Sequence, residues 1–295
     1  MIGFLLPCIF VLLAVYFYPV ARTLIMSFFS ISSIGAKADT WKWSGIGNYI
    51  KIMNSLDFRI SLINMVKLTV YGGIFMTIFA VIFAVLLSNN RKLKGRHAFR
   101  TIIYTPVLIS AVALGNAFIY YVYNNNDFGM LNSFLSIFGA DPVLWLTKHK
   151  FGCMVATIVF CCTGYHMMLY ISGIERIPVS LYEAAEMDGA GKVEQFFTIT
   201  LPLIKGTLKT SLTFWAIEAI QMFTWNQVFS PLDPEVSTIS PIVYMYSILF
   251  GTMGKGTGGS TDAGVAAAVG IVTAAIVQIM YLAFNKLFSD TDLEY

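Results

Sequence analysis

Charged residues are scarce in this chain. Asp, Glu, Lys and Arg make up 12% of its 295 residues, whereas soluble domains carry about 25%. Hydrophobic residues account for 57%. This composition excludes an ordinary soluble domain and predicts an all-α polytopic membrane protein, because a soluble globule of this length cannot hide so much apolar surface. The net charge of +3 is too small to indicate a nucleic-acid partner.

Signs of nucleotide, disulfide and metal chemistry are also lacking. No G-x-x-x-x-G-K-[ST] motif occurs, so the chain cannot hydrolyse a nucleotide alone. The tract Gly254–Gly259 fits G-x-G-x-x-G, but no strand is predicted before it, which favours a loop. The four cysteines all lie in apolar segments, where we expect packing rather than a disulfide framework. Cys162 and His166 share a helix face, but a third metal ligand is not evident.

Six apolar stretches are long enough to cross a bilayer, whose core of about 30 Å needs about 20 residues of helix. We interpret the first as a retained span, because it has neither a basic lead nor a clear cleavage site. The predicted spans cover about residues 2–29, 62–87, 101–123, 151–174, 208–229 and 263–288.

Basic residues in the short turn between the second and third spans set the predicted orientation. Five of them crowd this turn, which should therefore be cytoplasmic. Alternation then places the polar stretch 180–202 and both termini on the same side. The first loop also carries basic residues, so this prediction depends on local density. The five are Arg91, Lys92, Lys94, Arg96 and Arg100.

The polar stretch 180–202 is patterned for two short helices. Ser180 and Glu183 have the spacing of a capping box, which predicts that a helix begins at Ser180. Gly189 predicts its end, because glycine takes left-handed backbone angles without steric cost. A second amphipathic run follows and ends near Pro202. The expected product is an angled helix pair between two membrane spans.

The same stretch carries a family motif. Glu183-Ala184-Ala185 is followed after three residues by Gly189, and after nine more by Ile199-Thr200-Leu201-Pro202. This E-A-A-x3-G-x9-I-x-L-P pattern resembles the signature of permease subunits of ABC importers that work with a substrate-binding protein. Further segments resemble the carbohydrate branch of that family, typified by the maltose permeases. They are Tyr18-Pro19, Gly47-Asn48-Tyr49, Leu131-Asn132 with Trp145-Leu146, and Ile177-Pro178.

The resemblance implies a division of the chain and a coupling role. Residues 1–59 would form the first transmembrane helix and an extracellular loop, and 60–289 a five-helix core with a coupling loop at 177–204. Residues 290–295 would be a cytoplasmic tail. The loop would fit a separate ATPase and transmit its closure as a rigid-body switch. The coupling residues would be Glu183, Ala184, Ala185, Asp188, Gly189, Ile199, Leu201 and Pro202.

The resemblance also implies the partners. It predicts a second permease subunit in a heterodimer, two ABC ATPase subunits and an extracellular or periplasmic substrate-binding protein. The multi-pass chain would lie in a bacterial cell membrane, surrounded by lipid, and would pass a sugar. It would carry no catalytic residue, cofactor or metal, because ATP and Mg²⁺ would bind the ATPases.

The fifth predicted span holds a candidate substrate path. An acid in the membrane costs at least about 2.5 kcal/mol, so Glu218 should face the bundle interior or a wet cavity. Trp215 and Met222 are spaced to share its helix face. This face, with Tyr165 of the fourth span, resembles the sugar-lining face of the maltose permease, although Ala219 replaces an asparagine of the family. The alternative is a structural polar contact between spans.

Three other functions stay open at this point. The importer could carry another small solute, such as glycerol-phosphate or an amino acid. An intramembrane protease would use His166 with Thr163 or Ser172, but the chain has no G-x-S-x-G motif. A purely structural scaffold would leave the signature unexplained.

Overall fold

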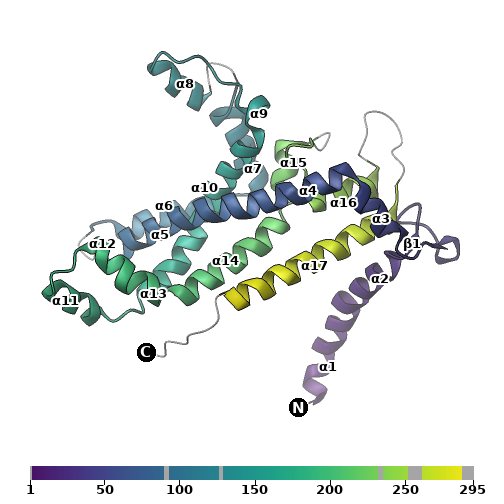
Figure 1. Ribbon diagram of the computed structural model, residues 1–295, viewed down its shortest axis with the longest axis horizontal. Helices are drawn as coiled ribbons and strands as arrows, with labels where there is room; N and C mark the ends of the chain where they lie inside the picture. Colours follow the sequence, from purple (N-terminus) through teal and green to yellow (C-terminus); the bar gives the residue numbers. More distant parts are fainter. Residues whose placement is uncertain (1, 90–92, 126–128, 232–234, 252–260, 288–295) are drawn as a thin grey trace. The chain divides into compact units, whose positions relative to one another are not determined.

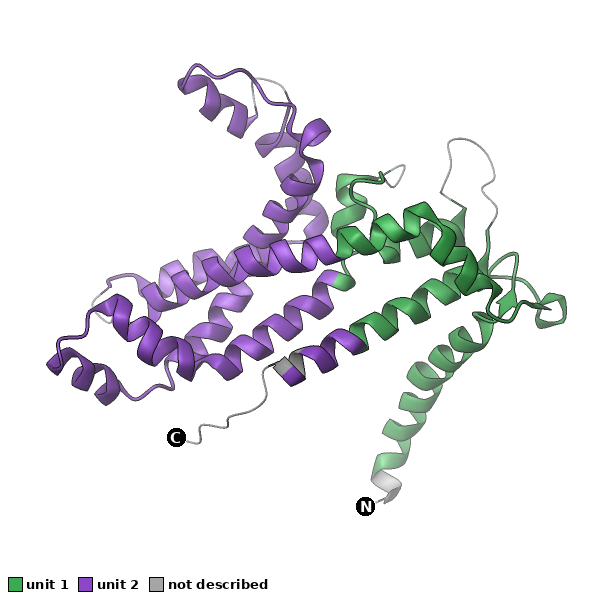
Figure 2. Cartoon of the chain, in the orientation of Figure 1, with its two compact units in different colours: residues 1–65, 220–278 green, residues 66–219, 279–295 purple. Residues whose placement is uncertain are grey.

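The computed structural model describes residues 2–89, 93–125, 129–231, 235–251 and 261–287. Helices make up most of this chain, and one hairpin pairs strand β1 (Phe29–Ser30) antiparallel to β2 (Lys42–Trp43). The chain divides into two compact units (Figure 2). Unit 1 comprises Met1–Met65 and Ile220–Gln278, and unit 2 comprises Val66–Ala219 and Ile279–Tyr295.

Unit 1 joins the beginning of the chain to a late segment. Its core consists of buried apolar side chains from helices on both sides of this long sequence gap, including Ile52, Phe58 and Val269. The elements are α1 (Ile2–Val11), η1 (Leu12–Phe17), α2 (Tyr18–Met26), η2 (Ala38–Thr40), α3 (Gly47–Asn54), α15 (Thr224–Phe229), α16 (Pro241–Phe250) and most of α4 (Leu56–Lys67) and α17 (Ala263–Leu287).

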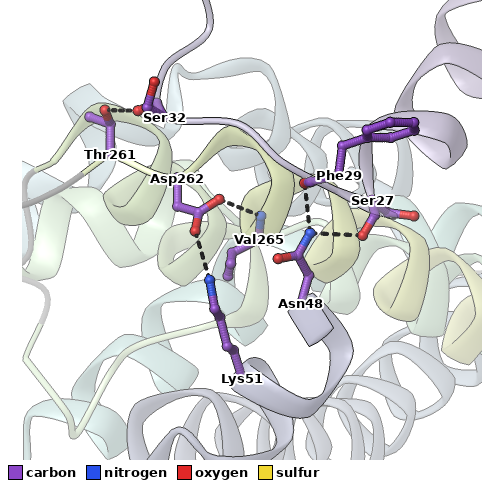
Figure 3. Close-up of polar contacts among 8 residues, drawn as sticks. All are labelled: Ser27, Phe29, Ser32, Asn48, Lys51, Thr261, Asp262 and Val265. Atoms are coloured by element: carbon purple, nitrogen blue, oxygen red, sulfur yellow. Dashed lines mark hydrogen bonds and ion pairs between the residues drawn. The ribbon is translucent and has the colours of Figure 1, made fainter. Parts of the chain in front are cut away.

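A buried asparagine fastens the first part of unit 1 (Figure 3). Asn48 Nδ2 donates hydrogen bonds to the carbonyl oxygens of Ser27 (2.9 Å) and Phe29 (2.8 Å). Gly264 lies against the same strand, where an added Cβ would be 1.9 Å from the Phe29 carbonyl oxygen. The backbone of α17 can therefore approach β1 this closely only because residue 264 has no side chain.

A polar group beside it caps the start of α17 (Figure 3). The Asp262 carboxylate accepts a hydrogen bond from the Val265 amide (3.0 Å) and pairs with Lys51 Nζ (3.3 Å). The Thr261 hydroxyl donates to the Ser32 carbonyl. These contacts join the first loop to the last long helix.

Unit 2 is organised around one long helix. α10 (Lys150–Ile174) packs against α5 (Gly73–Asn89), α6 (Arg96–Leu108) and the π-helical turn η3 (Leu68–Gly72). The remaining elements follow in chain order: α7 (Ala111–Ala117), η4 (Phe118–Val122), α8 (Met130–Ile137), α9 (Trp145–Lys148), α11 (Val179–Met187), α12 (Lys192–Gln195), η5 (Phe196–Thr200), α13 (Leu201–Leu203) and α14 (Lys205–Ile220).

Four helices in the described chain are long and apolar enough to cross a membrane, and a bent helix pair brings the number to five. The four are Leu5–Met26, Leu56–Ser88, Lys150–Ile174 and Ala263–Ala283. They lie within or over four of the six predicted spans. Of the basic residues behind the predicted orientation, Arg91 and Lys92 lie outside the described residues, as do the tract 254–259 and the tail 290–295.

The third predicted span is not one straight helix. Arg96–Leu108 and Ala111–Val122 meet at 100°. At the bend, three residues after Pro106, Ile109 has an extended backbone, and Ser110 follows with φ −53° and ψ 132°. The Cys161 thiol lies 3.4 Å from the Pro106 carbonyl oxygen. Because α6 ends at Leu108, the Pro106 carbonyl has no helical amide four residues on, and it accepts instead from the Ile109 amide (3.2 Å) and from this thiol of the neighbouring helix.

The prediction of a continuous fifth span at 208–229 is wrong. α14 ends at Ile220 and has 16 residues, and the short α15 begins only at Thr224. α14 is therefore shorter than the 18 residues required of a single-helix span here, and its two lysines and Glu218 also lower its apolar character. α16 was not predicted, because it is apolar but only 10 residues long.

Candidate functional site

The predicted helix pair is present, but its first cap differs from the prediction. α11 begins at Val179, Pro178 occupies the N-cap position, and no side chain caps the helix. Ser180 is therefore inside the first turn, and the capping box with Glu183 does not form. Pro178 follows Ile177 directly. Because the proline ring fixes the φ of residue 178, the helix can begin at the next residue without a polar capping side chain.

The bend after α11 forms at the predicted glycine. Gly189 has φ +84°, a left-handed angle that glycine adopts without a Cβ clash. The Gly189 amide donates to the Glu186 carbonyl (3.1 Å), and the Ala190 amide donates to the Ala185 carbonyl (2.9 Å). These two bonds form a Schellman motif, which ends the helix and turns the chain.

Side chains hold the two helices of the loop at this angle. The Tyr182 hydroxyl lies 2.9 Å from the Thr200 hydroxyl, and burial raises the pKa of Tyr182. Gln195 is buried, and its Nε2 donates to the Ala190 carbonyl (3.0 Å) directly at the bend. Lys192 pairs with Glu186, and this hydrogen bond lowers the pKa of the Glu186 carboxyl. The loop is therefore a fixed element with internal ties.

The outer surface of the loop combines apolar and acidic side chains. Met187 is 88% exposed, and Val193 and Phe197 are also exposed. Glu183 and Asp188 are exposed beside them. Of the other predicted coupling residues, Ala184, Gly189 and Pro202 are exposed, and Ala185, Ile199 and Leu201 are half-buried. Apolar groups rimmed by polar ones are typical of a protein-binding surface.

Helix α14 carries the candidate substrate path, and it has two distinct stripes. One stripe is buried within the chain and includes Ser211, Trp215 and Ala219. The other is exposed and follows a four-residue spacing, which keeps its members on one helix face. The exposed stripe comprises Gly206, Thr210, Phe214 and Glu218.

Trp215 is held by backbone groups of the neighbouring span. It is 1% exposed. A Cβ added to Gly72 would be 2.4 Å from its ring atom Cζ2, and one added to Gly73 would be 2.9 Å from Cδ1. The indole Nε1 donates to the Thr69 carbonyl at 2.9 Å. The indole therefore occupies space that is free only because residues 72 and 73 are both glycine.

The structure separates Trp215 from Glu218, which the spacing had placed on one face. The side chain that accompanies Glu218 is Phe214, one turn earlier, and its four-residue spacing was the available signal. Tyr165 is half-buried and touches the His166 ring edge-on (centroids 5.2 Å apart). Met222 is buried but follows the end of α14 and belongs to unit 1.

His166 lies in the interior of unit 2. It is fully buried, and its Nδ1 lies 2.7 Å from the Ser211 hydroxyl of α14. Within the described ranges, no three His, Cys, Asp or Glu side chains gather as metal ligands would. The contact with Ser211 accordingly gives His166 a role in joining α10 to α14.

Comparisons with known proteins agree with this architecture. The chain is 30% identical over 251 residues to a trehalose/maltose transport system permease protein of Thermococcus litoralis. The alignment covers 83% of this chain and 81% of the relative. It is 29% identical over 256 residues to a lactose transport system permease protein of Rhizobium radiobacter, with 84% and 82% covered.

A solved structure has the same fold. One chain of a bacterial ABC transporter involved in the import of the acidic polysaccharide alginate matches with a TM-score of 0.77 at 22% identity, covering 98% of this chain and 95% of that chain. A family model described as "Binding-protein-dependent transport system inner membrane component" matches residues 76–289, which include the helix pair and the stripes of α14. The chain thus belongs to the family of binding-protein-dependent transport system inner membrane components, multi-pass permease proteins of the membrane.

Proposed function

We propose that this chain is a permease subunit of an ATP-driven ABC importer for a sugar or oligosaccharide in a bacterial cell membrane. The observation that carries the proposal is the tied helix pair 179–203, which contains the signature and exposes Glu183, Ala184, Gly189 and Pro202 of it. Relatives named for trehalose/maltose and lactose transport favour a carbohydrate over another small solute. α14 and α15 would together complete a sixth crossing.

The helix pair would act as a lever on a separate ATPase subunit. Met187, Val193 and Phe197 offer apolar contacts to that partner, and Glu183 and Asp188 offer charges. Because the Schellman turn and the buried Gln195 fix the angle, movement of the ATPase would tilt α10 and α14 rather than bend the loop. ATP and Mg²⁺ would bind the two ATPase subunits, since this chain would supply only the mechanical link.

A second permease subunit and a substrate-binding protein would complete the importer. No residue in the most apolar stretch of the helix Leu5–Met26 is buried within the chain. That bare helix would pack on the other permease of a heterodimer and on lipid. An extracellular or periplasmic binding protein would deliver the sugar.

The exposed stripe of α14 would line the sugar path. Phe214 offers a ring face and Glu218 offers hydrogen-bond acceptors one turn apart, which suits a sugar with an apolar face and hydroxyl edges. Trp215 and Ala219 would support this stripe from behind, with Tyr165 at its side and Met222 beyond its end. No bond to the sugar is made or broken in such a path.

The test compares two glycines of the loop. An added Cβ meets nothing within 4 Å at either Gly189 or Gly191. Only Gly189 has a left-handed backbone, since Gly191 has φ −70° and ψ 165°. Gly189→Val should therefore reduce ATP-driven sugar uptake strongly in a reconstituted complex, whereas Gly191→Val should retain it. Full uptake by a well-expressed Gly189→Val complex would contradict the lever.

A further inference from the structure

The short helix α8 presents an apolar face that nothing in the described chain covers. Its members are Met130, Phe134, Ile137 and the following Phe138, spaced at four, seven and eight residues, so they share one face. Ile137 is 76% exposed and Phe138 is 72% exposed. The Phe134 and Phe138 rings meet edge-on with centroids 5.2 Å apart.

The opposite face of α8 is anchored, which fixes the direction of the apolar face. Asn132 is 3% exposed. Its Nδ2 donates to the carbonyls of Asn124 and Val143, both at 3.1 Å, and its Oδ1 accepts from the Val143 amide (3.0 Å) and from Trp145 Nε1 (2.8 Å). Four hydrogen bonds to one buried side chain prevent α8 from rolling its apolar face inward.

The same anchor sets the depth of α8 relative to the membrane. Trp145 begins α9, which is followed after one residue by the span α10. On the other side, α8 begins eight residues after Val122, a reach of at most about 28 Å. All of these elements belong to unit 2, and Figure 1 shows α8 beyond α9, with α7 farther along towards α10. α8 is therefore held near the end of a membrane span.

The charge pattern indicates what covers the face. Residues 129–140 contain no charged side chain; the exposed Asp141 follows directly, and the exposed Lys148 lies at the end of α9. An uncharged apolar helix face that lies beside a tryptophan and is followed by a charged segment suits the boundary between acyl chains and headgroups. We propose that α8 is an interfacial helix whose apolar face is covered by phospholipid acyl chains of the outer leaflet. The inference rests on the proposed function only for the side of the membrane.

The experiment places a photoreactive amino acid, p-benzoylphenylalanine, at Ile137 of the full complex in phospholipid vesicles. Irradiation should yield a product heavier by one phospholipid in mass spectrometry. The same probe at Phe138 repeats the test if the Ile137 variant fails to assemble. Ser136 on the side away from the apolar face is the matched control, and it should give no lipid product.

The alternative occupants appear as different products. Cross-linking of Ile137 and Phe138 to the binding protein or to the second permease would overturn the proposal, as would equal lipid yields at Ser136. Absence of any product at both apolar positions would also overturn it. Sugar uptake by the same vesicles reports on the proposed function separately, so the two failures are distinguishable.

Discussion

At the scale of single residues, the two stripes of α14 give neighbouring side chains different roles, one in packing and one on the exposed face. Trp215 and Glu218 are three residues apart, about 60° around a helix, so spacing alone could not decide whether they share a face. The paired glycines at 72 and 73, far away in sequence, settle it by admitting the indole. A single sequence holds no signal for that pairing.

This separation predicts different consequences for substitutions at the two positions. Glu218→Leu should leave thermal stability unchanged but reduce sugar-stimulated ATP hydrolysis, because the acceptors in the path are lost. Glu218→Gln should reduce it less. Trp215→Ala should instead destabilise the complex by about 3–5 kcal/mol, since it empties a buried aromatic seat. Thermal unfolding and ATPase assays on the reconstituted complex measure both effects, and full stimulation in Glu218→Leu would remove Glu218 from the path.

At the scale of elements, local chemistry was predictable where one residue decides the backbone. Gly189 predicted the bend because few residues tolerate its φ. The capping box failed because α11 begins at Val179, directly after Pro178 at the N-cap and one residue before Ser180. The break after Ile220 depends on the tertiary position of a moderately polar helix, so a hydropathy count could not find it.

The turn itself should depend on Gln195. Gln195→Ala removes the donor to the Ala190 carbonyl and should weaken the bent conformation by about 1 kcal/mol. Amide hydrogen exchange at Gly189 and Ala190 should then accelerate. Glu194→Ala, one residue earlier and exposed, is the control and should exchange like the unmodified protein. Equal rates in both variants would contradict a role for Gln195 in fixing the angle.

At the scale of the whole molecule, the close approach of α17 to β1 was invisible in the sequence, although Gly47-Asn48-Tyr49 resembled a family motif. Gly264→Ala should disrupt unit 1, because its Cβ would be 1.9 Å from a backbone oxygen. The expected cost is about 1–3 kcal/mol or more. Gly270→Ala on the same helix is the control, since its Cβ would be 3.5 Å from the Met245 sulfur. Thermal unfolding should separate the two variants, and identical midpoints would refute the close packing.

The contact between Asn48, Phe29 and Gly264 also has a consequence for synthesis. The ribosome releases residues 1–65 long before Asp262 and Gly264 exist, and all of residues 66–219 emerge in between. Until then Ile52 and Phe58 lack the partners from α16 and α17 that bury them. Residues 29–58 therefore lack these partners until α17 has been made, and during that time they should be open to proteolysis. Chains arrested before residue 261 should be cut by a protease within residues 29–58, and chains arrested after α17 should resist it.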